Sequence, residues 1–162
     1  MGPEIMGNRM IVIIDYGMGN LHSIKKALEY VGGEVVVSDK PEDLRAAERI
    51  VLPGIGAFGD GMANLRDSGM REALLEQVLE KRKPFLGICL GMQLLADRSF
   101  EFGTHEGLGI IPGEVKKFTF TSGQKLPIPH VGWNSMSFAP DHPLLDGVKN
   151  RSNFYFVHSY HF

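Results

Sequence analysis

The sequence predicts an α/β fold in which a doubly wound, mostly parallel sheet carries helices on both faces. Two observations lead to this prediction. Short apolar runs rich in Ile and Val alternate with amphipathic segments in the order βαβαβαβα, which produces parallel strands joined by crossover helices. Glycine-rich segments directly follow two of the expected strands. Because such sheets bind ligands at the carboxyl ends of their strands, we expect the functional residues on these loops.

The individual elements follow from apolar periodicity and from capping and breaking residues. Asn20 is expected to cap a helix that runs to Tyr30 and stops at Gly32-Gly33, and Gly69 is expected to break or bend a helical region. The expected strands cover residues 10–15, 34–38, 49–52 and 85–88, and the expected helices cover 20–30, 41–47, parts of 60–83 and 90–97. After residue 107 the signals for strands and helices no longer alternate, and strands are expected at 110–121 and 154–158.

Length and composition set broad limits on the kind of protein. A chain of 162 residues with 43% hydrophobic content can bury one substantial core, so we expect a single domain over residues 10–162, preceded by a disordered leader or alternative start region at 1–9. A net charge of −2 and a pI near 6.3 give no electrostatic footprint for nucleic acid or an anionic membrane. One cysteine cannot form an internal disulfide, and no apolar stretch approaches membrane-spanning length, so a cytoplasmic protein is expected.

The single cysteine, Cys89, lies in the pattern Gly-x-Cys-x-Gly between an apolar run and an amphipathic one. This pattern predicts a nucleophile elbow, a sharp strand-to-helix turn that presents the thiol at the carboxyl end of the sheet. Gly87 and Gly91 fit such a turn because neighbouring backbones come too close there for side chains. The helix N-terminus should favour thiolate over thiol through its positive end and unpaired N–H groups. A buried structural cysteine is the alternative.

A second informative segment, LPGIGAFG from Leu52 to Gly59, directly follows the third expected strand. Its backbone N–H groups can turn toward an anion, and in a doubly wound sheet the loop should lie beside the elbow. A plain strand-to-helix turn is the alternative.

Cofactor and metal sites are not expected. The loop from Asp15 to Asn20 follows a strand, but His22 occupies the place of the third glycine of a dinucleotide fingerprint. His158 and His161 lie three residues apart with no cysteine or carboxylate nearby in the sequence, which does not fit metal-ligand spacing.

Five segments, in order along the chain, carry a family resemblance. They are the loop 15–20, the loop beginning PGIG at Pro53, the elbow 84–95, IPHVGWN at 128–134 and FYFVHSYH at 154–161. Together they resemble the triad-type glutamine amidotransferases, and more narrowly the glutaminase subunit of imidazole glycerol phosphate synthase. The resemblance implies a flavodoxin-like fold and hydrolysis of glutamine to glutamate and ammonia. It also implies a heterodimer in which the ammonia passes to a cyclase subunit of histidine biosynthesis.

Carried over to this chain, the resemblance makes Cys89 the nucleophile that attacks the side-chain amide of glutamine and forms a γ-glutamyl thioester. By the elbow geometry, the oxyanion donors should be the backbone N–H of Leu90 and one N–H from Gly54 or Ile55. Gln93 lies one helical turn beyond Cys89 on the same face, and it matches a family glutamine that binds the substrate.

The remaining matches lie late in the chain or at the proposed partner surface. Ser159 and Tyr160 match positions whose backbone holds the amino-acid end of glutamine, although the Tyr160 ring could equally pack at a strand end. Asn20, Trp133 and Asn134 match residues near the cyclase interface and the ammonia exit. Without the resemblance, a lone tryptophan is more often part of a core than of an interface.

One part of the family pattern has no match in this sequence. The family supplies its base from a His-x-Glu pair beyond the position of His161, whereas this chain stops at Phe162 and its last acidic residue is Asp146. We therefore expect a C-terminally shortened form that is inactive as a glutaminase. Two other functions remain open: a paralogous subunit that supplies ammonia to a synthetase amidating surface sugars, and a non-catalytic or thiol-sensor fragment.

Overall fold

The computed structural model of the chain describes residues 10–120, 126–139 and 143–162. The leader expected at residues 1–9 and the last residue of the strand expected at 110–121 lie outside this described part. The chain divides into two compact units, one running up to residue 116 and including Phe162, the other comprising residues 117–161.

The first unit contains a four-stranded parallel sheet. Its strands are β1 (Met10–Ile14), β2 (Glu34–Ser38), β3 (Arg49–Leu52) and β4 (Phe85–Gly87), in the order β2-β1-β3-β4. The register pairs Ile13 with both Val37 and Val51. The chain passes from β1 to β2 at one edge of the sheet, and from β3 to β4 at the other edge. The direction in which strands are added therefore reverses between β1 and β3. Doubly wound sheets bind their ligands at such a switch point.

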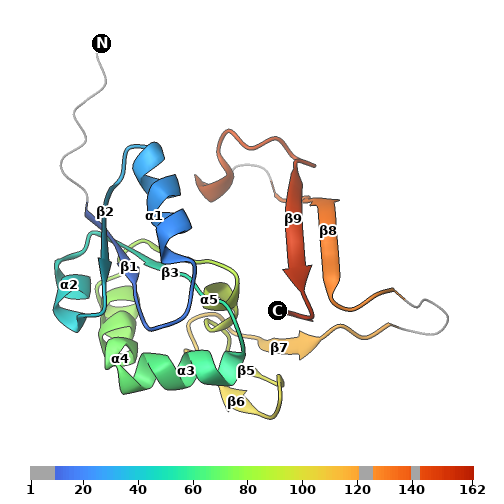
Figure 1. Cartoon of the computed structure of the whole chain (residues 1–162), viewed down its shortest axis with the longest axis horizontal. Coiled ribbons are helices and arrows are strands. Elements are labelled where there is room, and N and C mark those ends of the chain that lie inside the picture. Colours follow the sequence, from blue (N-terminus) through green and yellow to red (C-terminus); the bar gives the residue numbers. More distant parts are fainter. Residues whose placement is uncertain (1–9, 121–125, 140–142) are drawn as a thin grey trace. The chain divides into compact units, whose positions relative to one another are not determined.

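Helices cover both faces of this sheet, as predicted. They are α1 (Leu21–Tyr30), α2 (Pro41–Ala46), α3 (Phe58–Asp67), α4 (Met70–Leu75), the π-helical segment η1 (Glu76–Glu80) and α5 (Leu90–Gln93). Right-handed crossovers place α1 on one face and α2 to α4 on the other (Figure 1). The predicted start of α1 is confirmed, because Asn20 Oδ1 accepts the N–H of Ser23 at 3.2 Å. Gly69 separates α3 from α4 with φ of 72°, which confirms the predicted break.

The alternation of side chains along the central strands explains the core. Residues at odd positions on β1 to β3, such as Ile11, Ile13 and Val51, form one buried cluster against which apolar residues of α1 pack. Even-numbered neighbours such as Val12 and Leu52 are fully buried on the opposite face, as the two-residue period of a strand requires. Both faces of the sheet are therefore covered, and the loops at its carboxyl edge remain for function.

The helix after Cys89 is shorter than predicted. α5 ends at Gln93 instead of continuing to residue 97. The reason is that the N–H groups after Leu94 find other acceptors: Leu95 and Ala96 donate to carbonyls only three residues back, and Asp97 donates to the carbonyl of Gly113 at 3.0 Å instead of to that of Gln93. The chain continues to a second sheet, to which it contributes here β5 (Arg98–Ser99), β6 (His105–Glu106) and β7 (Glu114–Lys117).

β5 and β6 are two-residue strands, too short to leave a periodic signal in the sequence. β5 pairs with β6 antiparallel and with β7 parallel. The strand expected at 110–121 is thus reduced to β7.

The second unit is a hairpin with short flanking elements. β8 (His130–Ser135) and β9 (Asn153–His158) pair antiparallel, with His130 opposite His158 and Trp133 opposite Tyr155. The unit also contains the 3-10 turn η2 (Pro143–Leu145) and β10 (Tyr160–His161). β9 confirms the strand expected at 154–158. β8 was not expected, since the sequence predicts no strand between residues 121 and 154, and Gly132 lies within it.

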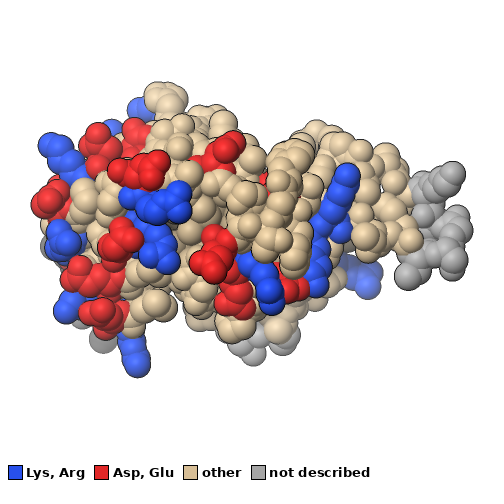
Figure 2. All heavy atoms as spheres, turned by 90° about the horizontal axis from the view of Figure 1, so that it is seen from below, with Lys and Arg blue, Asp and Glu red and all other residues tan. Residues whose placement is uncertain are grey.

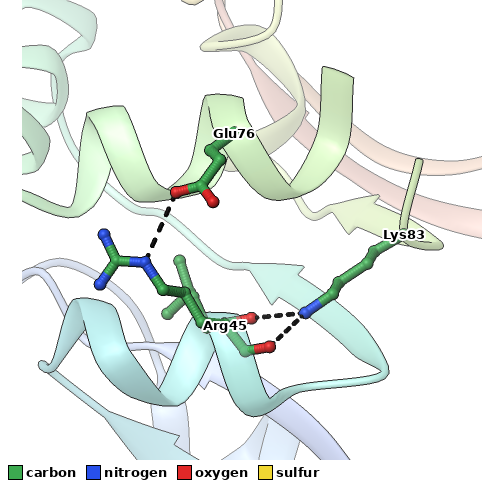
Figure 3. A network of polar contacts seen from close by, with 4 residues as sticks. Arg45, Glu76 and Lys83 are labelled. Carbon is green, nitrogen blue, oxygen red and sulfur yellow. Dashed lines mark hydrogen bonds and ion pairs between the residues drawn. The ribbon is translucent and has the colours of Figure 1, made fainter. Parts of the chain in front are cut away.

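A lysine near the start of β4 stabilises the end of α2 (Figure 3). Lys83 Nζ donates to the carbonyls of Leu44 at 3.0 Å and Arg45 at 2.7 Å, which are among the C-terminal carbonyls that a helix leaves unpaired. Arg45 Nε in turn lies 3.5 Å from a carboxylate oxygen of Glu76. Burial lowers the pKa of Lys83, and the nearby Glu76 raises it again. These contacts join α2 to η1 and to the segment before β4.

The charged side chains on the face seen in Figure 2 alternate in sign, with Lys and Arg beside Asp and Glu. Such a mixed surface carries no extended field of one sign. Among the described residues, no helix is both long and apolar enough to span a membrane.

Candidate active site

Cys89 occupies the tight turn that the sequence predicts. Its backbone has φ of 56° and ψ of −119°, a conformation that costs free energy for any residue other than glycine and that clusters at functional sites. An added Cβ at Gly91 would lie 1.9 Å from the carbonyl oxygen of Leu52, and one at Gly87 would lie 2.7 Å from the Cα of Met92. Both glycines are therefore required for the backbones to approach. The thiol is exposed, so the alternative of a buried structural cysteine is wrong.

The surroundings of the turn differ from the sequence-based expectation in two ways. α5 has a single turn, so it contributes far fewer aligned peptide dipoles than the eight-residue helix that was expected. β4 is half-buried throughout and forms one edge of the described parallel sheet, whereas the apolar run at 85–88 predicts a buried strand. The polar environment of Cys89 must therefore come mainly from individual N–H groups near the thiol.

The glycine-rich loop after β3 lies directly against the elbow, as predicted. An added Cβ at Gly54 would lie 2.8 Å from both the Cβ of Leu90 and the backbone N of Gly91, and Gly54 is buried. Within the described residues, the N–H groups of Gly54, Ile55 and Leu90 donate to no recorded backbone or side-chain acceptor. Unpaired N–H groups on two loops in contact, one of which carries an exposed thiol, are what an oxyanion site requires.

The loop after β1 adjoins the same site. An added Cβ at Gly19 would lie 3.2 Å from Pro53, so the loops after β1 and β3 are in contact at the switch point. Tyr16, in the first of these loops, is only 4% exposed and its hydroxyl donates to the carbonyl of Pro53 at 2.8 Å. Burial raises the pKa of Tyr16 well above its usual range, and the negative charge of an ionised Cys89 raises it further. Sequence reasoning did not single out Tyr16, because a tyrosine after an apolar strand gives no distinctive pattern.

Glu101 is a second residue that the sequence did not reveal. Its carboxylate accepts the N–H of Phe58 at 2.8 Å, the first residue of α3, whose N-cap Ala57 offers no side-chain acceptor. The Glu101 N–H donates to the hydroxyl of the fully buried Ser99 at 3.2 Å. Glu101 thus caps the helix that follows the glycine-rich loop, across 43 residues of sequence. Only the folded structure brings these residues together.

Gln93 and Asn20 lie near the elbow in the first unit. Gln93 is half-buried and is the last residue of α5, one turn after Cys89. Asn20 is exposed, and its carboxamide oxygen is already occupied by the cap of α1. Its amide nitrogen is the part of the side chain that a partner protein could use.

The other predicted residues belong to the second unit. Trp133 is 70% exposed and makes an edge-to-face contact with Tyr155 at 5.6 Å between ring centroids, so the core alternative for this tryptophan is wrong. The carbonyl of Ser159 accepts the N–H of Phe118 at 3.1 Å, and the carbonyl of Tyr160 lies 2.9 Å from His158 Nδ1. The Ser159 carbonyl retains a second lone pair.

Two histidines of the second unit form a directional hydrogen-bond chain. His158 Nδ1 must donate to the Tyr160 carbonyl, which can only accept, so His158 Nε2 accepts from His130 Nδ1 at 3.1 Å. His130 Nε2 then accepts from Asn134 Nδ2 at 2.6 Å. Among the described residues, no three His, Cys, Asp or Glu side chains gather as they would around a metal ion.

Comparisons with known proteins decide the family. A family model described as glutamine amidotransferase class-I matches residues 12–162. The chain belongs to this family. It is 49% identical over 152 residues to the imidazole glycerol phosphate synthase subunit HisH 1 of Campylobacter jejuni, covering 94% of this chain and 75% of that protein. It is 51% identical to the HisH subunit of Caldanaerobacter subterraneus, covering 94% of this chain and 72% of that protein. The resemblance inferred from the five segments is confirmed.

Solved structures support the fold of this amidotransferase. A glutamine amidotransferase from Thermotoga maritima matches with a TM-score of 0.59 and 19% identity over 95% of this chain and 62% of that one. A second glutamine amidotransferase matches with a TM-score of 0.56 and 22% identity over 65% of this chain and 56% of that one. The flavodoxin-like α/β fold is confirmed.

Proposed function

We propose that the chain carries the glutaminase site of an imidazole glycerol phosphate synthase, in which glutamine is hydrolysed to glutamate and ammonia at Cys89. The observation that supports this most strongly is the contact between the elbow and the glycine-rich loop. Gly54 lies against Leu90, the residue after Cys89, so the loop that would supply one oxyanion donor contacts the elbow that carries the thiol.

The proposed reaction uses these groups as follows. The Cys89 sulfur attacks the side-chain amide carbon of glutamine, a C–S bond forms, and the C=O electrons move to oxygen, where the N–H of Leu90 and one N–H of the Gly54-Ile55 loop stabilise the charge. The oxyanion electrons then re-form C=O, the C–N bond breaks, and the nitrogen leaves as ammonia after taking a proton from water, which replaces the proton that the thiol released to water on ionising. Water hydrolyses the thioester to glutamate and frees the thiol.

Other residues are proposed for binding and partner contact. Gln93 and the backbone at Ser159 and Tyr160 hold the substrate, and Asn20, Trp133 and Asn134 contact a cyclase subunit that receives the ammonia. We assign the general base to no residue of this sequence, because none of its six histidines is followed two positions later by Glu or Asp. The names of the relatives favour the cyclase over a sugar-amidating synthetase as partner. A heterodimer in the cytoplasm is part of this proposal.

A test of the nucleophile uses a glutamine analogue that carries a leaving group. It should label the protein at Cys89, free glutamine should slow the labelling, and Cys89→Ser should abolish it, because a serine hydroxyl is far less ionised at neutral pH. Peptide mapping identifies the labelled residue. Labelling at another residue, or labelling that glutamine does not slow, would contradict the proposal and would favour the thiol-sensor alternative.

A test of partner coupling measures glutamate release with and without the cyclase and its ligand, in a chain extended to the length of its relatives so that the family's general base is present. Ammonia is largely protonated in neutral water and then is not nucleophilic, so the pair of proteins benefits from hydrolysing glutamine only when the acceptor site is occupied. We expect stimulation through turning of the Gly54-Ile55 peptide into an oxyanion donor. Equal rates with and without the partner would contradict this coupling.

A further inference from the structure

The Tyr16 hydroxyl is the one side-chain group in the described structure that hydrogen-bonds the backbone of the glycine-rich loop at Pro53 and Gly54. Tyr16 follows β1 by two residues, its side chain is almost fully buried, and it donates to the Pro53 carbonyl at 2.8 Å. Gly54 is what allows this approach, since an added Cβ there would lie 2.5 Å from the Tyr16 hydroxyl oxygen. Gly54 therefore lies between Tyr16 and Leu90 and is close to both.

The geometry of a peptide unit makes this hydrogen bond informative. The Pro53 carbonyl and the Gly54 N–H belong to the same planar, trans peptide, so they point in opposite directions. A donor that holds the carbonyl therefore also fixes the direction of the N–H. No recorded hydrogen bond among the described residues holds the next peptide, between Gly54 and Ile55. One peptide of the loop is fixed and its neighbour is free to turn.

The charge state of the hydroxyl suits this role. Burial, and after it the negative charge of an ionised Cys89, raise the pKa of Tyr16. The hydroxyl consequently keeps its proton, and remains a donor to Pro53, while the nearby sulfur carries the negative charge that attack on a carbonyl requires.

We propose that Tyr16 is a positioning residue that fixes the Pro53–Gly54 peptide, so that the Gly54 N–H is held ready beside Cys89 and only the Gly54–Ile55 peptide turns during activation. This inference rests on the proposed oxyanion role of the loop. Tyr16 itself does not contact the reacting atoms.

The test compares two reactions of the same thiol in the full 162-residue chain. Cleavage of the γ-(4-nitrophenyl) ester of glutamate passes through an oxyanion but has a leaving group that needs no proton, whereas alkylation of the thiol by iodoacetamide forms no oxyanion. The rate of nitrophenol release by the Cys89→Ala protein is subtracted from that of each variant, so that only cleavage by the thiol is compared. Tyr16→Phe keeps the ring and removes only the hydroxyl, and Tyr30→Phe is the matched control, because Tyr30 is 92% exposed.

We expect Tyr16→Phe to lower kcat for the ester about tenfold, less than the loss of a whole oxyanion donor, while KM and the alkylation rate stay within about twofold. Tyr30→Phe should change neither reaction. An unchanged ester rate in Tyr16→Phe would overturn the role of Tyr16, and so would an equal fall in both reactions, because the hydroxyl would then support the whole elbow. If the unchanged protein cleaves no more ester than Cys89→Ala, the proposed function itself is wrong, and the role of Tyr16 with it.

Discussion

Replacing Gly91 with alanine tests whether the backbone contact between β3 and the elbow sets the position of Cys89. The added Cβ would lie 1.9 Å from the Leu52 carbonyl oxygen, whereas contacts under 3.0 Å are essentially absent for real Cβ atoms. The two backbones must therefore separate by roughly 1.1 Å, the difference between these distances. The same carbonyl accepts the N–H of Ile88 at 2.9 Å, so the separation also weakens the hydrogen bond that leads into Cys89.

The expected cost has two parts. Overpacking of this kind destabilises a fold by about 1–3 kcal/mol, and a displacement of about 1 Å at a reacting group lowers its rate by about 10²-fold. Gly61→Ala is the matched control, because its Cβ would meet only leucine methyl groups at 3.3 Å and alanine favours the helix by up to about 1 kcal/mol.

The assay combines urea unfolding with the rate of ester cleavage at Cys89. We expect Gly91→Ala to lose both stability and rate, and Gly61→Ala to keep both. If Gly91→Ala unfolds at the same urea concentration and reacts as fast as the unchanged protein, the Leu52 carbonyl does not constrain the elbow and the reasoning is refuted.

Three further predictions concern α2, pH and the partner surface. Lys83→Met should destabilise the fold by about 1–2 kcal/mol in urea unfolding, because two carbonyls of α2 lose a charged donor, whereas Lys81→Met should stay within about 0.5 kcal/mol. The pKa of Tyr16 is raised in the fold, so above pH about 10 the unfolded chain loses this proton before the folded chain does. The free energy of unfolding should therefore fall with rising pH in this range, by up to about 1.4 kcal/mol per pH unit. If the Tyr16→Phe protein shows the same slope of unfolding free energy against pH, this prediction is contradicted. Trp133→Ala should raise the Kd for the cyclase at least fivefold in a binding titration, the scale of an interface hot spot, and an unchanged Kd would remove Trp133 from the interface.

The central elements could be predicted because their signals are local. The strands at 34–38 and 49–52, the Asn20 cap and the break at Gly69 each depend on apolar runs or on a residue with a special backbone role, and the structure confirms them. The elbow was equally predictable, since glycine on both sides of a cysteine reflects a steric need that is visible in the sequence.

What could not be predicted depends on contacts between distant segments. α5 ends early because the N–H of Asp97 donates to the carbonyl of Gly113 instead of to that of Gln93, and no pattern in residues 90–97 reveals this competition. The bonds of Tyr16 to Pro53 and of Glu101 to Phe58 span 37 and 43 residues. Such side chains have no spacing rule, so their roles emerge only when the fold brings their partners to them.

The order of the strands explains why three separate loops meet at one thiol. Because β1 and β3 are adjacent parallel strands, the loops after them begin side by side, and β4, next to β3, adds the elbow. At each contact a glycine faces the neighbouring segment: Gly19 faces Pro53, Gly54 faces Leu90, and Gly91 faces the Leu52 carbonyl. The position of Cys89 is therefore set by close backbone approaches, whereas the buried hydroxyl of Tyr16 holds the carbonyl of Pro53 in the neighbouring loop. The side chain of Ile55, which is 58% exposed, contributes little to this framework, so its peptide can turn while the elbow stays in place.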